Sequence, residues 1–337
     1  MADWTAGQNS NVRAGEGFGS RQQRRRCSSV AKFTFRTLAA AGSQAVVALP
    51  ERARYLCVSQ FPLSERGAYD WLRKRTDVKA VFFIHDLLPL QYPEYFRSRE
   101  PARHRRRLEQ LATVGSAALV SSRAVADVLR EEMNRLGRHG FPIYIAPMPL
   151  AESFVPGPAS SHITRAAPYF ILCSTIEPRK NHLTILHVWR EMSAVLGPLT
   201  PKLILVGARG WENENVVDLL DRSPAIREHV LELSDVATPT LVELIRGARA
   251  LLMPSFAEGY GLPVAEARAL GVPVIASDIP VFHEVTGGDF TAVPPTDGPG
   301  WLSAVMSAQI ASPALRPPNL PARQLDFSSL REFLQSL

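Results

Sequence analysis

The sequence predicts an α/β protein made of two domains, each with a parallel sheet. Short apolar, β-branched segments alternate along the chain with segments of helical periodicity, and this alternation is typical of parallel strands joined by crossover helices. A proline-studded stretch at 147–168, with five prolines and no periodicity, interrupts the alternation and indicates a linker. The chain of 337 residues is long enough to bury the cores of two such domains.

The first domain is expected to span residues 45–150. Five apolar segments predict its strands, at residues 45–49, 55–61, 78–86, 117–122 and 142–147. Three segments predict its helices, at residues 65–75, 101–114 and 124–133. Residues 1–44 come before it, and their polar composition, rich in Gly, Arg and Ser, predicts disorder. The run GEGFGS at 15–20 imitates a dinucleotide-binding fingerprint, but no apolar strand precedes it, which argues against an NAD-dependent oxidoreductase.

The second domain is expected to span residues 169–311, after a linker at 151–168. Six apolar segments predict its strands, at residues 169–175, 202–207, 229–234, 250–255, 273–277 and 290–295. Three segments predict its helices, at residues 181–196, 239–247 and 263–270. A Pro-rich segment and a short helix near 328–336 fill residues 312–337. Because ligands of open parallel sheets bind outside the carboxyl ends of the strands, two such domains predict a ligand-binding cleft between them.

One stretch of the second domain, SFAEGYGLPVAEARALGVPVIAS at 255–277, has the pattern of a strand end, a glycine turn, a helix and a further strand. This order is typical of a βαβ crossover. Pro263 suits the first position of the helix and Gly271 suits its C-cap. These boundaries predict that Glu266 lies in the first helical turn.

Two glutamates, Glu258 and Glu266, flank this turn with seven residues between them. Backbone N–H groups at a helix N-terminus bind phosphate, and an ionised carboxylate accepts two hydrogen bonds from a vicinal diol. We therefore expect amides near Gly261 and Leu262 to face a phosphate while the glutamates bind hydroxyl groups on either side of it. In the alternative interpretation, Glu258 is a solvated loop charge and Glu266 complements the helix dipole.

Charged side chains also follow two other predicted strands. His85 and Asp86 end a buried strand of the first domain, and Glu177, Arg179 and Lys180 come just before the first helix of the second. An Arg and a Lys beside a helix N-terminus suit a diphosphate, because the guanidinium forks two oxygens and the ammonium adds a point charge. The alternatives are a core histidine at His85 and a structural Glu177 that orients the Arg179 loop.

The charge of the chain is distributed unevenly. Residues 1–150 hold 24 Lys/Arg against 13 Asp/Glu, whereas residues 151–337 hold 14 against 19. Such a basic half suits nucleic acid, an anionic membrane surface or an acidic substrate. The sequence has no zinc-finger spacing and no RNP-type motif, which argues against nucleic acid. We therefore expect an anionic membrane surface as partner, with Arg103, Arg106 and Arg107 on one helical face; a merely solvated face is the alternative.

Three scattered cysteines, Cys27, Cys57 and Cys173, form no metal-type cluster and indicate a reducing compartment. No apolar run is long enough to span a bilayer, and the first thirty residues lack the apolar stretch of a signal peptide. These features predict a cytoplasmic protein, bound at most peripherally to the inner face of a membrane.

Several stretches, in order along residues 78–311, together resemble a known family. They are HDLLPLQYPEYF (85–96), SSRAVADVL (121–129), STIEPRKNH (174–182), LVGARGW (205–211) and the long stretch 234–285 with its E-x7-E signature. The family is the retaining GT-B glycosyltransferases of family 4, or glycosyl transferases group 1, and the HDLLPL stretch is similar to mannosyltransferases of surface polysaccharide synthesis. The E-x7-E signature is weak alone and strong in combination with EPRKN and HD. The resemblance implies two Rossmann-like domains and transfer of a sugar from a nucleotide diphosphate donor.

The resemblance implies catalytic roles for four residues. His85 would face the sugar near the reacting carbon, and Glu258 would lie beside the transferred sugar. Arg179 and Lys180 would bind the diphosphate.

The resemblance also implies a set of donor-binding residues. Glu266 would bind the ribose hydroxyls, and the amides of Gly261 and Leu262 would bind the phosphate, with Tyr260 beside them. The nucleobase pocket is assigned to residues that follow two strands of the second domain: Gly207, Trp211, Asp235 and Val236.

The expected chemistry uses neither a metal nor a cofactor. No Asp-x-Asp motif occurs in the sequence, so Arg179, Lys180 and helix amides would stabilise the departing diphosphate in place of Mg²⁺. The leaving group would depart to give an oxocarbenium-like centre, which the acceptor hydroxyl attacks from the same face. The favoured donor is GDP-mannose, and the favoured acceptor is a growing surface polysaccharide or lipid-linked glycan.

Two alternatives stay open: a catalytically inactive nucleotide-sugar-binding homologue and a GT-B sugar-nucleotide epimerase. In the family a glycine-rich loop follows the first strand and covers donor and acceptor. Here the corresponding glycine-rich run is GEGFGS, and no apolar strand precedes it. The N-terminal domain is therefore expected to be shortened. Donor turnover separates the enzyme from the inactive homologue, and return of an epimerised donor would identify the epimerase.

Overall fold

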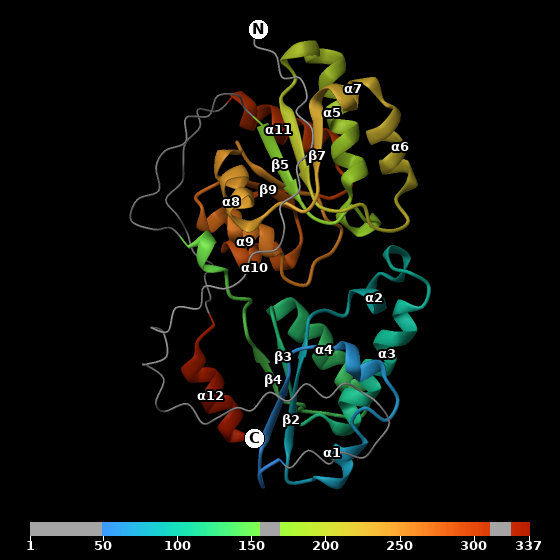
Figure 1. The fold of residues 1–337 in the computed structure, drawn as a ribbon, viewed down its shortest axis with the longest axis vertical. Coiled ribbons are helices and arrows are strands. Elements are labelled where there is room, and N and C mark those ends of the chain that lie inside the picture. Colours follow the sequence, from blue (N-terminus) through green and yellow to red (C-terminus); the bar gives the residue numbers. More distant parts are fainter. Residues whose placement is uncertain (1–48, 156–168, 311–324) are drawn as a thin grey trace, which may run out of the picture. The chain divides into compact units, whose positions relative to one another are not determined.

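The computed structural model describes residues 49–155, 169–310 and 325–337. The predicted segment 1–44, nearly all of the predicted strand 45–49 and most of the predicted linker lie outside these residues, and Leu49 belongs to no strand. The described residues form two parallel sheets with helices packed on them (Figure 1). The predicted fold class is therefore confirmed.

The first sheet has four parallel strands in the order β1-β2-β3-β4. The strands are β1 Arg54–Cys57, β2 Lys79–Ile84, β3 Ala117–Val120 and β4 Ile143–Ile145. The helices between them in sequence are α1 Asp70–Lys74, α2 Leu88–Gln91, α3 Glu100–Val114 and α4 Arg123–Arg135. Side chains alternate across a strand, so Phe82 packs with Leu111 of α3 and Leu129 of α4, whereas Phe83 belongs to a cluster on the other face.

That other face is covered by the last helix of the chain, α12 Phe327–Ser336. Its Phe333 packs against Tyr144 of β4, with ring centroids 5.1 Å apart. The Nε of Arg54 in β1 donates to the carbonyl oxygen of Leu334 at 2.8 Å, which satisfies a carbonyl that a helix end leaves without a partner. The helix predicted near 328–336 is present, and it packs on the first sheet although the second lies between them in sequence.

The second sheet has six parallel strands in the order β10-β9-β8-β5-β6-β7. The strands are β5 Tyr169–Cys173, β6 Lys202–Val206, β7 Val230–Leu233, β8 Leu251–Met253, β9 Val274–Ser277 and β10 Thr291–Val293. The helices are α5 His182–Leu196, α6 Glu214–Arg222, α7 Pro224–His229, α8 Thr238–Gly247, α9 Leu262–Ala269, α10 Pro280–Thr286 and α11 Gly298–Ile310.

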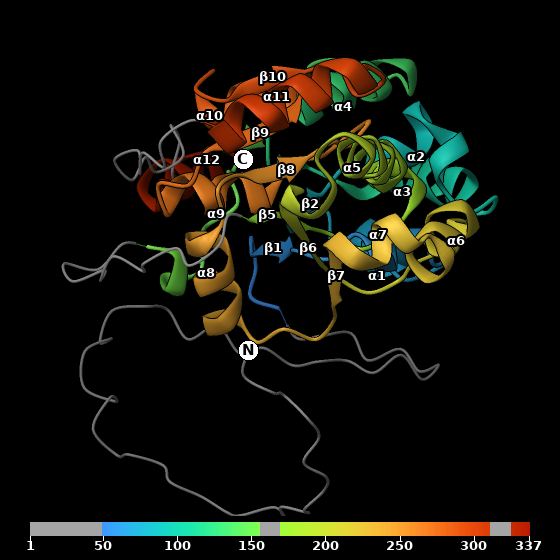
Figure 2. The same ribbon diagram turned by 90° about the horizontal axis from the view of Figure 1, so that it is seen from above.

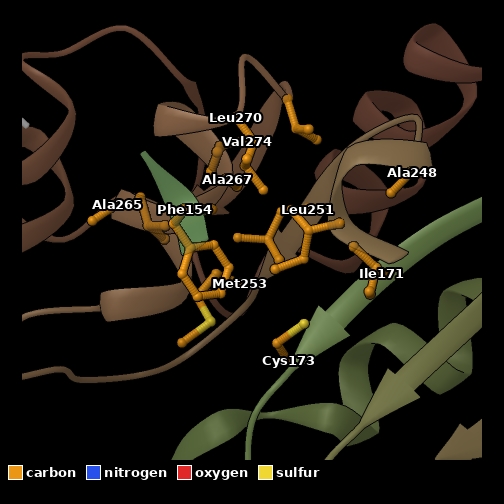
Figure 3. Close-up of a cluster of buried hydrophobic side chains, with 14 of the residues drawn as sticks. Phe154, Ile171, Cys173, Ala248, Leu251, Met253, Ala265, Ala267, Leu270 and Val274 are labelled. Atoms are coloured by element: carbon orange, nitrogen blue, oxygen red, sulfur yellow. The ribbon is translucent and has the colours of Figure 1, made fainter. Parts of the chain in front are cut away.

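The helices of the second sheet divide between its two faces (Figure 2). Helices α5, α6, α7 and α11 pack on one face, where Trp189 and Trp301 are completely buried. Helices α8, α9 and α10 pack on the other face. There Ala265 and Ala267 of α9 lie over Leu251 and Met253 of β8 (Figure 3). Small alanines let α9 approach the sheet closely, so its amino end is fixed relative to the end of β8.

Both ends of α9 are set by glycines. Gly261 precedes the helix with φ +90°, and a Cβ there would lie 2.6 Å from the ring of Phe282. At the other end Gly271 has φ +71°, its N–H donates to Arg268, and the N–H of Val272 donates to Ala267. This is a Schellman motif, which satisfies carbonyls at the helix end.

The helix begins at Leu262 with Pro263 second, so Glu266 is its fifth residue. The prediction that Glu266 lies in the first turn is therefore wrong. The helix starts one residue earlier than expected, because left-handed Gly261 ends the turn. Glu266 is consequently too far from the helix end for the dipole interpretation.

Three further expectations for the first domain are wrong. The strand expected at 55–61 ends at Cys57, because the chain turns into a short 3₁₀ helix at Phe61–Ser64, where Pro62 cannot donate to a ladder. The helix expected at 65–75 is limited to α1, since Gly67 before it has a left-handed φ of +78°. Arg107 of α3 is 2 % exposed and contacts His104, so it does not share a solvent face with Arg106.

Candidate active site

The carboxyl ends of β5 and β8, the two central strands of the second sheet, are tied together by Asn181. This residue precedes α5 with a left-handed φ of +55°. Its Nδ2 donates to the carbonyl oxygens of Pro254, at 3.1 Å, and Pro295, at 2.8 Å. The N–H of Phe256 donates to the carbonyl oxygen of Arg179 at 2.9 Å. The EPRKN stretch and the E-x7-E signature are therefore in direct contact.

Glu258 lies at the centre of a cluster of four buried charges at these strand ends. Its Oε1 lies 2.6 Å from the ammonium of Lys180, and its Oε2 lies 2.7 Å from the guanidinium of Arg179. Arg179 also binds Glu177 at 2.8 Å, and the hydroxyl of Ser255 donates to Glu258 at 2.7 Å. These four charged side chains are between 5 % and 14 % exposed. Glu258 is therefore no solvated loop charge, and Glu177 orients Arg179 as the structural interpretation proposed.

The ion pairs, rather than burial, decide the protonation of this cluster. Burial acts to raise the pKa of the Glu258 carboxyl, but the charges of Lys180 and Arg179 outweigh it and lower the pKa to about 2. Burial acts to lower the pKa of the Arg179 guanidinium, but Glu258 and Glu177 outweigh it and the pKa is raised. Two carboxylates and two cations are thus charged together, and the cluster is neutral as a whole.

Arg179 and Lys180 differ in how far the protein uses their donors. The Nη1 of Arg179 donates hydrogen bonds to Glu258 and to the carbonyl oxygen of Ala257, at 2.7 Å each. Its Nη2 donates to Glu177. Lys180 gives one hydrogen bond, to Glu258. An ammonium has three donors and a guanidinium has five, so each side chain keeps two N–H groups that no described residue accepts. On Arg179 these are one N–H of Nη2 and the buried Nε.

Glu266, the second signature glutamate, has a raised carboxyl pKa, whereas that of Glu258 is lowered. Among the described residues no donor group is hydrogen-bonded to its carboxylate, and burial raises its pKa to about 7. It lies near Cys173 at the end of β5, where burial and the charge of Glu266 raise the pKa of the thiol. A partly buried carboxylate without a partner costs free energy unless a ligand supplies hydrogen bonds.

The turn between the two glutamates offers backbone donors. The N–H groups of Gly261 and Leu262 have no acceptor in the described part of the chain. The helix that they begin adds the positive end of its dipole. Tyr260, between the two glycines, is partly buried, and burial with the charge of Glu284 raises the pKa of its hydroxyl to about 12. Unused amides therefore lie on the same helix as the unpartnered Glu266.

His85 lies at the end of β2, next to this turn. A Cβ on Gly259 would lie 2.8 Å from the carbonyl oxygen of His85, so only glycine lets the turn approach so closely. The His85 ring is exposed, packs on Phe83, and places Nε2 3.2 Å from the carbonyl oxygen of Val58. His85 is therefore not a buried core histidine. Asp86 accepts the N–H of Leu88 at 3.2 Å, which is a local turn contact.

The four residues assigned to the nucleobase pocket follow β6 and β7. Gly207 follows β6 with φ +154°, and a Cβ there would lie 2.0 Å from the carbonyl oxygen of Ser174. Trp211 is partly buried, and the guanidinium of Arg97 lies 5.2 Å from the centroid of its ring. Asp235 follows β7 in a left-handed conformation and is exposed, and Val236 is partly buried.

Several contacts of this site could not be predicted from the sequence. Tyr95 stacks on Phe256 with ring centroids 5.0 Å apart, and Arg97 packs on Trp211. Ser121 and Ser122 donate to the carbonyl oxygen of Gly259. These contacts join residues far apart in sequence, and no local pattern signals them.

The described residues contain no helix long and apolar enough to cross a membrane, and no group of acidic, His and Cys side chains placed to hold a metal ion.

The chain is similar to known proteins in sequence and in fold. Residues 159–297 match the family model of the glycosyl transferases group 1. The serotype-specific mannosyltransferase WbdA of Escherichia coli is 30 % identical over 228 residues, which is 61 % of this chain and 27 % of that protein. The O-antigen chain mannosyltransferase B of E. coli is 30 % identical over 65 % of this chain and 58 % of its own length. RfbU, an O-antigen chain mannosyltransferase of Salmonella typhimurium, is 31 % identical over 49 % of this chain and 45 % of its own.

Solved structures show the same fold. HepE of Anabaena, solved in complex with UDP, superposes with a TM-score of 0.61 at 18 % identity, over 85 % of this chain and 79 % of that one. Sucrose-phosphate synthase of Thermosynechococcus elongatus superposes with a TM-score of 0.59 at 21 % identity, over 80 % and 66 %. The chain thus carries a glycosyl transferases group 1 domain and has the GT-B fold, which confirms the resemblance. It spans between about a quarter and three-fifths of the three curated relatives named above.

Proposed function

We propose that this protein is a retaining, metal-independent glycosyltransferase that moves mannose from GDP-mannose to a glycan or lipid-linked glycan acceptor. The observation that carries the proposal is Glu266, a carboxylate without a protein partner on the helix whose first amides are also unused. The ribose diol of a nucleotide would supply the hydrogen bonds that this carboxylate lacks, and its diphosphate would accept from Gly261 and Leu262.

Lys180 is proposed as the cation that binds the diphosphate. It makes one hydrogen bond to the protein, whereas the guanidinium of Arg179 makes three, to Glu177, Glu258 and a backbone carbonyl. Arg179 then serves to hold Glu258 and the glycine turn in place. Lys180 and the amides beside it would offset the negative charge of the departing diphosphate, so the proposed chemistry uses no metal.

The transfer step is proposed to proceed with retention. The bond between the sugar carbon and the diphosphate oxygen breaks, and Lys180 with the α9 amides stabilises the negative charge that develops on the diphosphate. The acceptor hydroxyl attacks that carbon from the same face, and its proton passes to the departing phosphate oxygen. His85 is exposed at the end of β2 beside the Gly259 turn, which places it where a sugar attached to that diphosphate could reach it. The proposed place of Glu258 beside the sugar is compatible with its carboxylate being held by Lys180 and Arg179.

Mannose is proposed as the sugar because three relatives named above are mannosyltransferases. GDP-mannose is the donor favoured by the HDLLPL stretch at 85–90. A growing surface polysaccharide is the proposed acceptor class, because two of those relatives are named for O-antigen chains.

An anionic membrane surface is proposed as a further partner. Arg99, Arg105 and Arg106 on and before α3 are exposed, whereas Arg103 pairs with Glu100 at 2.7 Å. Exposed basic side chains close to a negative surface are attracted to it.

The function is tested with a thermal-shift panel of nucleotide sugars, followed by a turnover assay with each donor that binds. The proposal expects GDP-mannose to raise the melting temperature most and to release GDP only when a glycan acceptor is present. Binding without turnover over a range of acceptors would indicate the inactive homologue. Return of an epimerised nucleotide sugar without acceptor would indicate the epimerase.

A further inference from the structure

The amino end of α4 is satisfied by a carboxylate from a distant part of the chain. The first N–H groups of a helix have no acceptor within it. In α4 the N–H of Arg123 lies 2.8 Å from both carboxylate oxygens of Glu284, and the N–H of Ala124 lies 3.4 Å from one of them. The next N–H, of Val125, donates to the hydroxyl of Ser122 at 3.2 Å. Glu284 belongs to α10, 161 residues along the chain from Arg123.

A carboxylate is the group that this helix end requires. Negative charge is stabilising at a helix N-terminus, and hydrogen bonds from backbone N–H groups to a carboxylate are charge-assisted. Helix α4 has no acidic residue in its own first turn. Glu284 therefore supplies to α4 what its own sequence does not.

The same end of α4 is bonded to the turn between the two signature glutamates. The hydroxyl of Ser122 donates to the carbonyl oxygen of Gly259 at 2.8 Å, and the hydroxyl of Ser121 donates to it at 3.3 Å. Gly259 directly follows Glu258 and lies against the backbone of His85. Whatever fixes residues 121–124 thus also fixes the turn beside His85.

We propose that Glu284 is a positioning residue of the transfer reaction. By capping α4 it holds residues 121–124 on the Gly259 turn, so that Glu258 and His85 are aligned when the sugar transfers. Among the described residues, Glu284 makes no hydrogen bond or ion pair with Glu266, Lys180 or the α9 amides; of the donor-binding residues, its charge acts on the hydroxyl of Tyr260 alone. Its loss should therefore lower turnover and leave nucleotide binding nearly unchanged. The kinetic part of this inference rests on the proposed function.

The test compares Glu284→Ala and Glu284→Gln with the matched control Glu243→Ala. Glu243 is an exposed glutamate on α8 that pairs with Arg246 of its own helix. Hydrogen exchange of peptides covering 121–129 should show faster exchange of the Arg123 and Ala124 amides in Glu284→Ala and not in the control. The kcat of Glu284→Ala should fall about tenfold to a hundredfold, as expected when reacting groups are misplaced. The Kd for GDP should stay within about twofold of wild type, since nucleotide contacts are intact.

Glu284→Gln keeps one accepting oxygen but loses the negative charge, so the amide exchange rates and the kcat of this variant should lie between those of wild type and Glu284→Ala. It also keeps the test decisive if the alanine variant does not fold. Unchanged exchange in Glu284→Gln and Glu284→Ala would overturn the cap, and faster exchange with unchanged kcat would overturn the positioning role. If the wild-type protein turns over no donor, the proposed function and the kinetic role fail together, while the exchange rates still decide whether Glu284 caps α4.

Discussion

The carboxylate of Glu258 lies 2.6 Å from the ammonium of Lys180, and the two side chains are 7 % and 12 % exposed. This pair joins the E-x7-E signature to the EPRKN stretch, and Arg179 extends it into a neutral cluster with Glu177. Glu266, eight positions after Glu258, has no such partner in the described residues and a raised pKa. The two signature glutamates therefore differ in kind: Glu258 is held by the protein, and Glu266 is available to a ligand.

Glu258→Ala should destabilise the fold, because Lys180 and Arg179 lose a buried counter-charge. Removing one partner of a buried ion pair costs about 3–5 kcal/mol, whereas the surface change Glu243→Ala should stay within about 0.5 kcal/mol of wild type. The pKa of Glu258 is lowered in the folded state, so its contribution is present above pH 4.5 and is lost as pH falls toward 2. Urea unfolding at pH 7 and at pH 3 measures both effects. Equal stability of Glu258→Ala and wild type at pH 7 would contradict the cluster.

Nucleoside binding should depend on pH through Glu266. The carboxyl has a pKa raised to about 7, and only its ionised form accepts two hydrogen bonds from a ribose. Affinity for guanosine, which has no phosphate to titrate, should therefore rise between pH 6 and pH 8, with release of a proton on binding. Calorimetry in buffers of different ionisation enthalpy measures that proton. Glu266→Gln serves as control and should abolish the pH dependence; its persistence in this variant would assign the proton to another group.

The same raised pKa predicts the effect of Glu266 on the ligand-free protein. A group whose pKa is raised on folding contributes stability that is fully present below its unfolded value and is lost as pH rises through the folded value. The stability of wild type relative to Glu266→Gln should therefore fall between pH 4.5 and about 7. Thermal unfolding of wild type and Glu266→Gln between pH 4.5 and pH 7 measures this difference in stability. A difference that stays constant or grows in favour of wild type as pH rises would contradict the prediction.

Lys180 and Arg179 should contribute differently to diphosphate binding. Lys180→Ala should weaken GDP binding about tenfold or more, as expected for loss of a charge-assisted hydrogen bond, and should leave guanosine binding unchanged. Arg179→Lys keeps the charge but loses the fork, so it should lower the free energy of unfolding by about 1–3 kcal/mol and change GDP affinity little. Calorimetry measures the affinity of each variant for GDP, and urea unfolding measures its stability. The division of roles is wrong if Arg179→Lys weakens GDP as much as Lys180→Ala does.

Binding to anionic vesicles should depend on the exposed arginines of the α3 region. Replacing Arg99, Arg105 and Arg106 by Ala should weaken sedimentation with anionic vesicles at low salt by on the order of 1 kcal/mol per residue. The matched control replaces three exposed arginines of the second half: Arg190, Arg222 and Arg227. Arg107 is excluded because it is buried. Equal loss in both triple variants would show that general charge, rather than this surface, attracts the vesicles.

Much of the fold could be predicted because its signals are local. Strands β5, β6 and β8 are mainly apolar runs, and Gly261 and Gly271 predict the boundaries of α9 to within one residue. Helices α2, α6, α7 and α10 were missed, although prolines in the first turn of α2, α7 and α10 are local signals. Helix α10 has Pro280 as its first residue and left-handed Gly287 after its end.

The partners of charged residues could not be predicted, because they depend on contacts distant in sequence. Nothing near Arg107 shows that it is buried against His104, and nothing near Arg123 shows that its N–H meets Glu284. The sequence also leaves open which of Arg179 and Lys180 makes more hydrogen bonds to the protein. That distinction follows from Glu177, whose position beside Arg179 appears only in the folded chain.

The central claim, that Glu266 binds the ribose of a nucleotide donor, is tested most directly by titrating GDP and its 2′,3′-dideoxy analogue into wild type and Glu266→Ala. In wild type, loss of both hydroxyls should weaken binding about tenfold to a hundredfold, because charge-assisted hydrogen bonds contribute about 1.5–3 kcal/mol. Glu266→Ala should bind GDP as weakly as wild type binds the analogue, and should bind the two ligands equally. If Glu266→Ala still discriminates between them as strongly as wild type does, the ribose is bound elsewhere and the assignment of Glu266 is contradicted.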